Sequence, residues 1–307
     1  TLFSLHNLFI LLFAGFFALM SCEGPKGPEG PQGPQGPAGP SGAEQCGVCH
    51  NNSNDLVAKQ VQWAASVHGT GMDFERNTTT CAPCHTSQGF IEVLETGALT
   101  TAANVQNPVG QNCRACHKIH TNYDSTDWAL RKTDETKLRL TNEVFDYKEG
   151  NLCAQCHQAL AATLPDPTTQ ETYQITSNRW GPHHSTAANI LAATGAIEMA
   201  GSVQYGDTKH ISYVKNTCVS CHMAQAFGAQ AGGHTMNMSY DSHGSEVDNV
   251  VACTGCHSGL KKFDDKGQII TNTLVKLTDL RNRLAAAGIL DTTASHGVYS
   301  SDLFKPG

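Results

Sequence analysis

The five-residue pattern Cys-x-x-Cys-His occurs six times in this sequence. The cysteine and histidine content of the chain predicts only about 0.03 such matches by chance. Two thiols at this spacing can each bond a haem vinyl group, and the histidine that follows is then held against the iron as an axial ligand. Zinc sites or thioredoxin-like cysteine pairs would not require a histidine at the fifth position every time. The pattern therefore predicts six covalently bound haem c groups.

The motifs supply the predicted attachment and proximal-ligand residues. The attachment cysteines are Cys46, Cys49, Cys81, Cys84, Cys113, Cys116, Cys153, Cys156, Cys218, Cys221, Cys253 and Cys256. The proximal iron ligands are His50, His85, His117, His157, His222 and His257. Successive motifs start 32 to 65 residues apart. Intervals this short cannot give each haem a domain core of its own, so we expect one domain with stacked haems.

Further histidines are available as the second axial ligands. A protein of this length has about six histidines in all, whereas this chain has 15. The surplus indicates that histidine also binds the far face of the irons. The predicted distal ligands are His68, His120, His183, His184, His210, His234 and His243, while His296 is a weaker candidate because it lies beyond the last predicted helix.

The position of some of these histidines limits what they can bind. His120 follows His117 by three residues, so it cannot easily reach the far face of its own haem and is expected to ligate a neighbouring one. Of His183 and His184, one is expected to bind iron and the other to hydrogen-bond beside it. We favour His183 as the ligand.

The fifth motif has a histidine on each side. His210 precedes it and His234 follows it, so one of them is expected to serve its iron and the other a different haem. Two glycines before His234 allow a close approach of the backbone to a porphyrin. Methionine is the competing axial ligand and would raise the reduction potential. The histidine surplus makes it the minority choice among Met72, Met199, Met223, Met236 and Met238.

The composition predicts a mainly α fold with extensive coil, wrapped around stacked haems, with little or no sheet. Only 15% of the residues are charged and 7% aromatic, and 29 are glycine. Large apolar side chains are scarce for 307 residues, so the haems themselves are expected to supply apolar mass. Apolar spacing and polar caps predict helices over Asn54–Ser66, Ser185–Met199 and Thr273–Ala287, the last ended by Gly288.

The N-terminus is typical of an exported lipoprotein. Residues 2–20 are almost wholly apolar, and the phrase that ends in Cys22 resembles a lipobox. We expect a lipoprotein-type signal peptide over residues 1–21 and lipidation of Cys22, with an uncleaved membrane anchor as the alternative. Haem attachment is export-side chemistry, so the protein is expected outside the cytoplasm. A lipid anchor would hold it on the cell envelope, at the outer membrane or cell surface.

A collagen-like spacer follows the lipobox. From Gly24 to Gly42 every third residue is glycine, and proline follows it throughout the repeat. Residues 22–43 are therefore expected to form a stiff polyproline II spacer of about 55 Å, or a trimerising stalk. The hexahaem domain is expected over residues 44–307. The chain begins without Met and stops soon after its last predicted helix, so we expect both ends to be truncated.

From Glu44 to about Leu290 the sequence resembles multihaem c-type cytochromes. The motifs carry the resemblance, and shorter phrases are similar to ones in the superfamily of pentahaem nitrite reductases, octahaem hydroxylamine oxidoreductases and tetrathionate reductases, and in extracellular electron-transfer cytochromes. These phrases are Trp63–Gly69, Cys84–Phe90, Trp180–Ser185, Cys221–Met223 and Gly232–Thr235. The resemblance implies a helical and coil multihaem cytochrome c fold with haems in parallel and perpendicular stacked pairs. The Cys-x-x-Cys-Lys motif of the catalytic haem in pentahaem nitrite reductases does not occur in this sequence.

Two functions fit these features. The first is electron transfer through six-coordinate haems to other cytochromes or extracellular electron acceptors, with a homo-oligomer formed through the stalk or through filament stacking as an open alternative. The second is reduction of a nitrogen or sulfur oxyanion at a five-coordinate haem, for which Lys118, Arg179 and Lys209 are nearby basic groups. A structural collagen-like role does not explain six haems. The net charge of −7 argues against nucleic acid as a partner.

Overall fold

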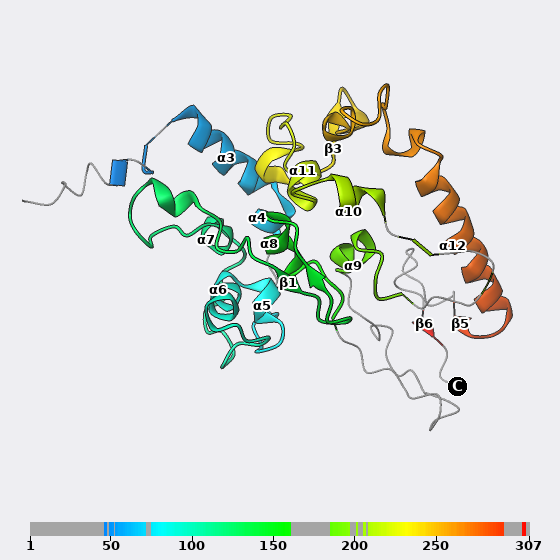
Figure 1. Cartoon of the computed structure of the whole chain (residues 1–307), viewed down its shortest axis with the longest axis horizontal. Coiled ribbons are helices and arrows are strands. Elements are labelled where there is room, and N and C mark those ends of the chain that lie inside the picture. The colour runs from blue at the N-terminus through cyan, green and yellow to red at the C-terminus, as the bar shows by residue number, and fades with distance from the viewer. Residues whose placement is uncertain are drawn as a thin grey trace, which may run out of the picture. The chain divides into compact units, whose positions relative to one another are not determined.

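The computed structural model describes residues 46–47, 49–51, 53–71, 75–160, 185–196, 201, 205–206, 208–291 and 303–304. All of them belong to one compact unit, Gly42–Gly307, drawn in Figure 1. The predicted signal peptide, the lipidated Cys22, the spacer at residues 22–43 and the predicted ligands His183 and His184 lie outside the described residues.

Short helices joined by coil make up most of the described part. The α-helices are α3 Asn54–Ala65, α4 Val67–Thr70, α5 Ala82–His85, α6 Ser87–Thr96, α7 Cys113–Cys116, α8 Gly150–Ala154, α9 Ala187–Leu191, α10 Lys209–Tyr213, α11 Cys218–His222 and α12 Ile269–Ala286. The 3-10 helices are η1 Ser125–Trp128, η2 Gly233–Thr235, η3 Val251–Cys253 and η4 Phe263–Asp265.

The sheet content is small. Three antiparallel strand pairs occur in the described residues: β1 Thr136–Lys137 with β2 Val144–Phe145, β3 Ser239–Ser242 with β4 Ser245–Asp248, and β5 Leu290–Asp291 with β6 Leu303–Phe304. The prediction of a mainly α chain with extensive coil and little sheet is confirmed at this level.

Two of the three predicted helices have the expected extent. In α3 the Ser53 side chain caps the N-terminus by accepting a hydrogen bond from the Leu56 N–H at 3.3 Å. Helix α12 begins at Ile269, four residues before the predicted start, and ends at Ala286. Beyond that end, Gly288 has φ of 75°, a left-handed conformation that glycine adopts without strain.

The helix predicted over Ser185–Met199 is much shorter than expected. Helix α9 covers only Ala187–Leu191, and Ala193 and Gly195 follow it with positive φ values of 52° and 84°. The Thr194 N–H turns back to the Asn189 carbonyl at 2.9 Å, which ends the helical path. Apolar spacing at this site overestimated the helix because it does not detect left-handed residues.

Helix α6 was not predicted from the sequence. The Thr86 hydroxyl accepts a hydrogen bond from the Gly89 N–H at 2.9 Å, Phe90 and Val93 are buried, and Gly97 ends the helix with φ of 70°. A cap, two apolar residues three positions apart and a terminal glycine are ordinary helix signals. They were obscured because the helix begins immediately after the second motif.

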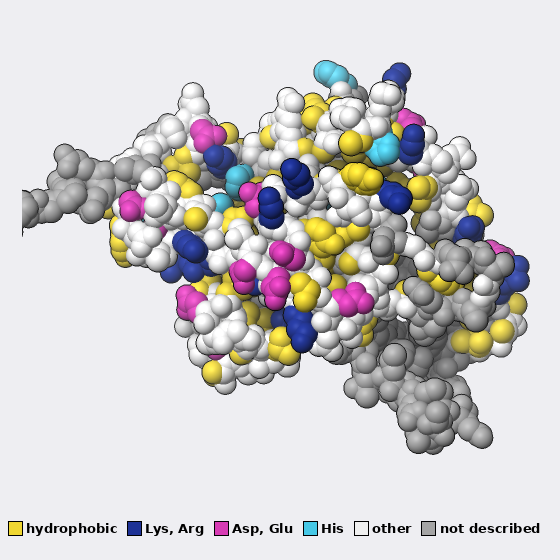
Figure 2. Space-filling view, in the orientation of Figure 1, with side chains coloured by type: hydrophobic (Ala, Val, Ile, Leu, Met, Phe, Trp, Pro, Cys, Tyr) yellow, Lys and Arg dark blue, Asp and Glu magenta, His cyan; other side chains and the backbone are white. Residues whose placement is uncertain are grey.

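The buried core is thin and lies around the motif cysteines. One cluster joins Leu138, Phe145, Ala154, Ala188 and Ile211. A second joins Phe90, Ala115 and Leu152, with Cys116 and Cys156 packed against it. Elsewhere apolar side chains lie at the surface among charged ones (Figure 2). On α12, for example, Leu274 and Leu280 are 49% and 51% exposed. None of the described helices is long and apolar enough to cross a membrane.

Candidate haem-attachment and iron-ligand sites

Each motif folds as a single turn of helix. In five motifs the N–H of the histidine donates to the carbonyl of the first cysteine, at 2.7 to 3.1 Å, and the fifth motif forms α11. One turn brings side chains three positions apart to the same face of the helix. The two cysteines of each motif are therefore placed to attach to one haem. The twelve motif cysteines are free thiols in this structure.

Four motif histidines each face a histidine from outside the motifs. The ring centroids are 6.1 Å apart for His50 and His120, 5.8 Å for His157 and His68, 6.4 Å for His117 and His234, and 6.1 Å for His257 and His210. Two imidazole nitrogens that each lie about 2 Å from one metal ion place their ring centroids roughly 6 Å apart.

The way these rings are matched favours paired axial ligands over simple ring packing. Aromatic rings in direct contact have centroids about 4.5–7 Å apart, so distance alone does not distinguish the two. Every one of the four pairs, however, joins a motif histidine to a non-motif histidine, and none joins two motif histidines. An iron with one proximal and one distal histidine requires this matching.

In three motif histidines the Nδ1 atom of the ring lies within hydrogen-bonding distance of an oxygen atom. The Nδ1 atom lies 2.5 Å from the Trp128 carbonyl oxygen in His117, 2.9 Å from the Met236 carbonyl oxygen in His222, and 2.9 Å from the Ser185 hydroxyl in His157. A metal-ligating histidine commonly uses its other nitrogen in this way, which fixes the tautomer and the orientation of the ring. In all three residues Nε2 is left to face a metal, so the donor set fits haem iron.

His68 is held by a sharp break between α3 and α4. The buried Ser66 hydroxyl donates to the Trp63 carbonyl at 2.7 Å and accepts from the Gly69 N–H at 2.9 Å. A Cβ atom at Gly69 would collide with the same Trp63 carbonyl, so the break requires glycine. The Trp63 ring lies parallel to the His68 ring with centroids 5.8 Å apart. The phrase Trp63–Gly69 thus fixes where His68 lies.

His234 is tied to a helix far away in the sequence. Its backbone N–H donates to the Gln62 side-chain oxygen of α3 at 3.0 Å. Gly232 and Gly233 have positive φ values of 68° and 52°, and added Cβ atoms would collide with the Gln225 carbonyl and the Gln62 side chain. The path of the chain itself thus requires both glycines, and the close approach of a porphyrin to them stays a prediction.

Partial burial affects the protonation of both of these distal rings. It lowers the pKa of His68 and the pKa of His234, because removing a ring from water disfavours its charged form. Neutral imidazole is the form that binds a metal.

His120 and His210 depend on local capping. His120 has φ of 64°, and the buried Asp127 carboxylate accepts hydrogen bonds from three consecutive backbone N–H groups that follow it, at 2.7 to 3.2 Å. His210 lies in α10, where the Thr208 hydroxyl caps the helix and donates to the Leu191 carbonyl at 2.8 Å. The adjacent Ile211 packs into the first core cluster.

The arrangement around the fifth motif differs from the sequence interpretation. His210 and His234 were expected to provide one ligand for that motif, but the structure places them opposite His257 and His117. Among the described histidines none faces His222. His243 is exposed at the turn between β3 and β4, and no motif histidine of the described part faces it. The structure therefore pairs the motif histidines of the first, third, fourth and sixth motifs, and among the described residues the fifth has no such pair.

Thiols of different motifs are also in contact. A hydrogen bond between Cys84 and Cys156 lowers the pKa of the Cys84 thiol to about 7 and raises that of Cys156. A second bond, between Cys153 and Cys218, lowers the pKa of the Cys218 thiol to about 6 and raises that of Cys153. Both contacts involve the fourth motif.

A basic cavity beside the fourth motif was missed from the sequence. It has a volume of about 250 Å³ and is lined by four basic residues, Arg131, Lys132, Lys137 and Arg139, and two acidic ones, Asp134 and Glu135. Gln155 and Gln158, which flank Cys156 and His157, complete its polar lining. The Arg131 and Lys132 side chains are only 13% and 14% exposed. The run of basic residues between the third and fourth motifs was the available signal.

Comparison of the chain with protein-family models, with curated proteins and with solved structures gives no match.

Proposed function

We propose that this protein is an electron carrier with six covalently bound haem c groups in one domain of the multihaem cytochrome c type. The twelve motif cysteines would form the thioether bonds, and the six motif histidines would be the proximal ligands. The observation that carries the proposal is the one-to-one matching of four motif histidines with His120, His68, His234 and His210 at centroid separations of 5.8 to 6.4 Å.

Bound haem supplies a reversible one-electron change between ferric and ferrous iron. The residues of the chain determine what this chemistry can be used for. A histidine on each face leaves no coordination position for a substrate, which favours electron transfer over catalysis. The Nδ1 contacts of His117, His157 and His222 hold the proximal rings in place, so little rearrangement would accompany a change of charge.

The basic cavity fits the same function. Each haem carries two propionate carboxylates, and arginine and lysine are their natural counter-ions. Arg131, Lys132 and Arg139 would hold propionates next to the fourth motif. Asp134 already pairs with Lys132 at 2.9 Å and Glu95 lies 3.8 Å from Arg131, so propionates would join or replace these ion pairs.

The location and partners that we propose follow from the N-terminal sequence. Lipidation of Cys22 would anchor the protein to the cell envelope, and the Gly-Pro-x spacer would hold the haem domain away from the lipid surface. The partners would then be other cytochromes or extracellular electron acceptors. Membrane fractionation of the native chain and of Cys22→Ala tests the anchor, because an unchanged membrane fraction in the variant would contradict it.

A second function, reduction of a nitrogen or sulfur oxyanion, is favoured by one observation. No described histidine faces His222, so the haem of the fifth motif is the candidate for an open coordination position. Such a site would bind nitrite or hydroxylamine directly at iron.

Visible and EPR spectra of the purified holoprotein decide between the two functions. For the electron carrier we expect mass spectrometry to find six haem additions, and EPR to give only low-spin ferric signals that nitrite and hydroxylamine leave unchanged. A high-spin ferric signal that shifts when either compound is added would instead support the reductase. Fewer than six additions would contradict the motif assignment itself.

A further inference from the structure

The fourth motif lies in contact with several of the other motifs. Helix α8, which carries Cys153, lies between α5 of the second motif and α11 of the fifth (Figure 1). If the six haems formed a simple row, each motif would adjoin at most two others. Residues 149–156, which contain both cysteines of the fourth motif, contact three other motifs.

The second motif touches the fourth directly. The Cys156 thiol donates to the Pro83 carbonyl, inside the second motif, at 3.8 Å. Pro83 lies between the attachment cysteines Cys81 and Cys84, so the haems attached at the two motifs would adjoin each other.

The fifth motif meets the other end of α8. An added Cβ atom at Gly150 would collide with the Thr217 side chain, so only glycine allows this close approach. The Asn216 side chain donates to the Glu149 carboxylate at 3.0 Å and links the residues just before the two motifs. Helices α8 and α11, which carry Cys153 and Cys218, are thereby held in contact.

The third motif shares an apolar cluster with the fourth. Cys116 and Cys156 both pack against Phe90, Ala115 and Leu152. The first and sixth motifs lack such contacts with the fourth in the described residues. The first is linked instead to the third, because His120, which faces His50, follows His117 by three residues.

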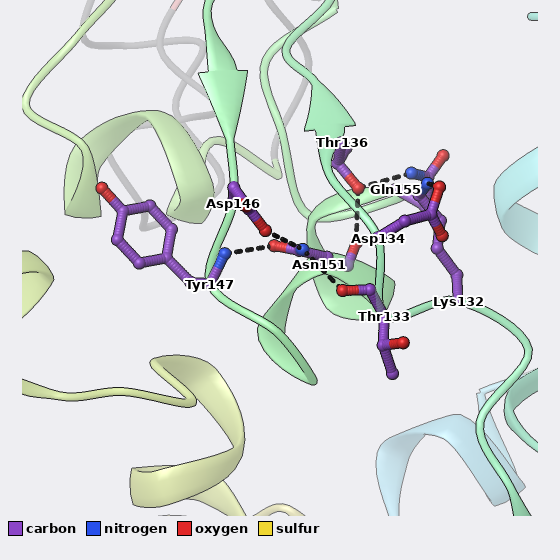
Figure 3. A network of polar contacts seen from close by, with 8 residues as sticks. All are labelled: Lys132, Thr133, Asp134, Thr136, Asp146, Tyr147, Asn151 and Gln155. Atoms are coloured by element: carbon purple, nitrogen blue, oxygen red, sulfur yellow. Dashed lines mark hydrogen bonds and ion pairs between the residues drawn. The ribbon is translucent and has the colours of Figure 1, made fainter.

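A buried polar network holds the fourth motif in this position (Figure 3). The Asn151 amide donates to the Thr133 carbonyl and to the Asp146 carboxylate, both at 3.1 Å, and its oxygen accepts from the Tyr147 N–H at 2.6 Å. The Thr136 hydroxyl donates to the Asn151 carbonyl at 2.8 Å. Asn151 is fully buried with these groups satisfied, which fixes the start of the motif.

We infer that the haem attached at Cys153 and Cys156 is the branch point of a branched array, adjoining the haems of the second, third and fifth motifs. The inference rests on the proposed function and adds the route. The second and third motifs also adjoin each other, because the Gln111 side chain donates to the Cys84 carbonyl at 3.0 Å. The first motif lies beyond the third, and the sixth beyond the fifth, where η3 contacts α11. Each transfer moves one electron from a ferrous to a ferric iron, with no bond made or broken and no proton exchanged.

To test the inference, one haem is reduced while the others stay ferric, and the ferric EPR signals whose relaxation changes are counted. Replacing a distal histidine by methionine raises the potential of the haem that it ligates. In His68→Met the fourth haem, and in the matched control His210→Met the sixth haem, can then be reduced while the others stay ferric. A ferrous low-spin haem is diamagnetic, so the ferric haems next to it lose a magnetic neighbour and their EPR signals relax more slowly.

We expect three of the five remaining signals to change their relaxation in His68→Met and only one in His210→Met. An equal count in the two variants would overturn the inference. Both variants must first carry six haems by mass, and loss of haem or of low-spin signals in the unaltered protein would point to failure of the proposed function instead.

If a variant does not load its haems, the unaltered protein provides the same count. During stepwise reduction, the reduction of the haem ligated by His157 should change three other signals. A haem array in which no single reduction changes more than two others would contradict a branch point.

Discussion

The four histidine pairs differ in how the two imidazole rings are turned toward each other. The ring planes are 25° apart for His50 and His120 and 29° for His117 and His234. They are 88° apart for the pair at the fourth motif and 71° for the pair at the sixth. In His117 and His157 a contact at Nδ1 holds the ring in its orientation.

This difference predicts two kinds of low-spin EPR signal. Near-parallel axial rings split the two iron d orbitals that overlap with the π systems of the rings, which gives a rhombic spectrum. Near-perpendicular rings leave these two orbitals almost equal in energy, which gives a strongly anisotropic signal. We expect two signals of each kind from the four pairs. The variant His234→Met should remove a rhombic signal, and its matched variant His210→Met a strongly anisotropic one. Loss of the same kind of signal in both variants would contradict the assigned pairs.

At the scale of single residues the sequence was sufficient to identify the candidates but not to pair them. The motif histidines follow from covalent spacing, which is local information. The pairing of His117 with His234 depends on the Gln62 contact and on the left-handed glycines before His234. Such contacts between residues far apart in the sequence leave no periodic pattern, so the fold was needed to find them.

Some of the helices could also be predicted from the sequence, and others could not. Helices α3 and α12 were predictable because a cap or a terminal glycine agrees with their apolar spacing. Helix α9 was overestimated because Ala193 adopts a left-handed conformation that no sequence signal marks. The exposed Leu274 and Leu280 on α12 indicate that this helix depends little on burial and strongly on its N-terminal contacts.

Those contacts predict a dependence of α12 on pH. The Asp264 carboxylate accepts hydrogen bonds from the Thr271 hydroxyl and from the Ile270 and Thr271 N–H groups. These bonds lower the pKa of Asp264. A carboxyl whose pKa is lowered by folding contributes its full stabilisation above its unfolded pKa of about 4, and loses it as the pH falls through the folded pKa.

We therefore expect amide-exchange protection in α12 to decrease below about pH 4 in the native chain. In Asp264→Asn, protection should already be lower at neutral pH, and this added pH dependence should be reduced. Asp279→Asn is the matched control, because it removes only an exposed ion pair with Arg283, which contributes about 0.3–0.5 kcal/mol. Equal effects of the two substitutions at neutral pH would show that Asp264 does not cap the helix.

At the scale of the whole molecule the core is too small to account for a folded chain of this length. The two buried clusters hold only eight residues, of which three are alanine. Of the motif cysteines, Cys116 and Cys156 pack against the second cluster. Haem attachment at those cysteines would add apolar surface where the chain has least of its own, so cofactor binding and folding are expected to be coupled.

This coupling predicts that the chain does not fold cooperatively without haem. Any group that binds only the folded state stabilises it, and the covalent haems would supply most of the core. Holoprotein is expected to unfold in one cooperative transition, whereas chain produced without haem attachment should give poorly dispersed NMR spectra and no transition.

The branch point predicts in addition which haem contributes most to stability. Cys153→Ser with Cys156→Ser should destabilise the protein by at least about 3 kcal/mol more than Cys46→Ser with Cys49→Ser, because the fourth motif lies against three others and the first does not. Chemical denaturation of the two five-haem variants measures the difference, and equal stabilities would contradict a core organised around the fourth motif.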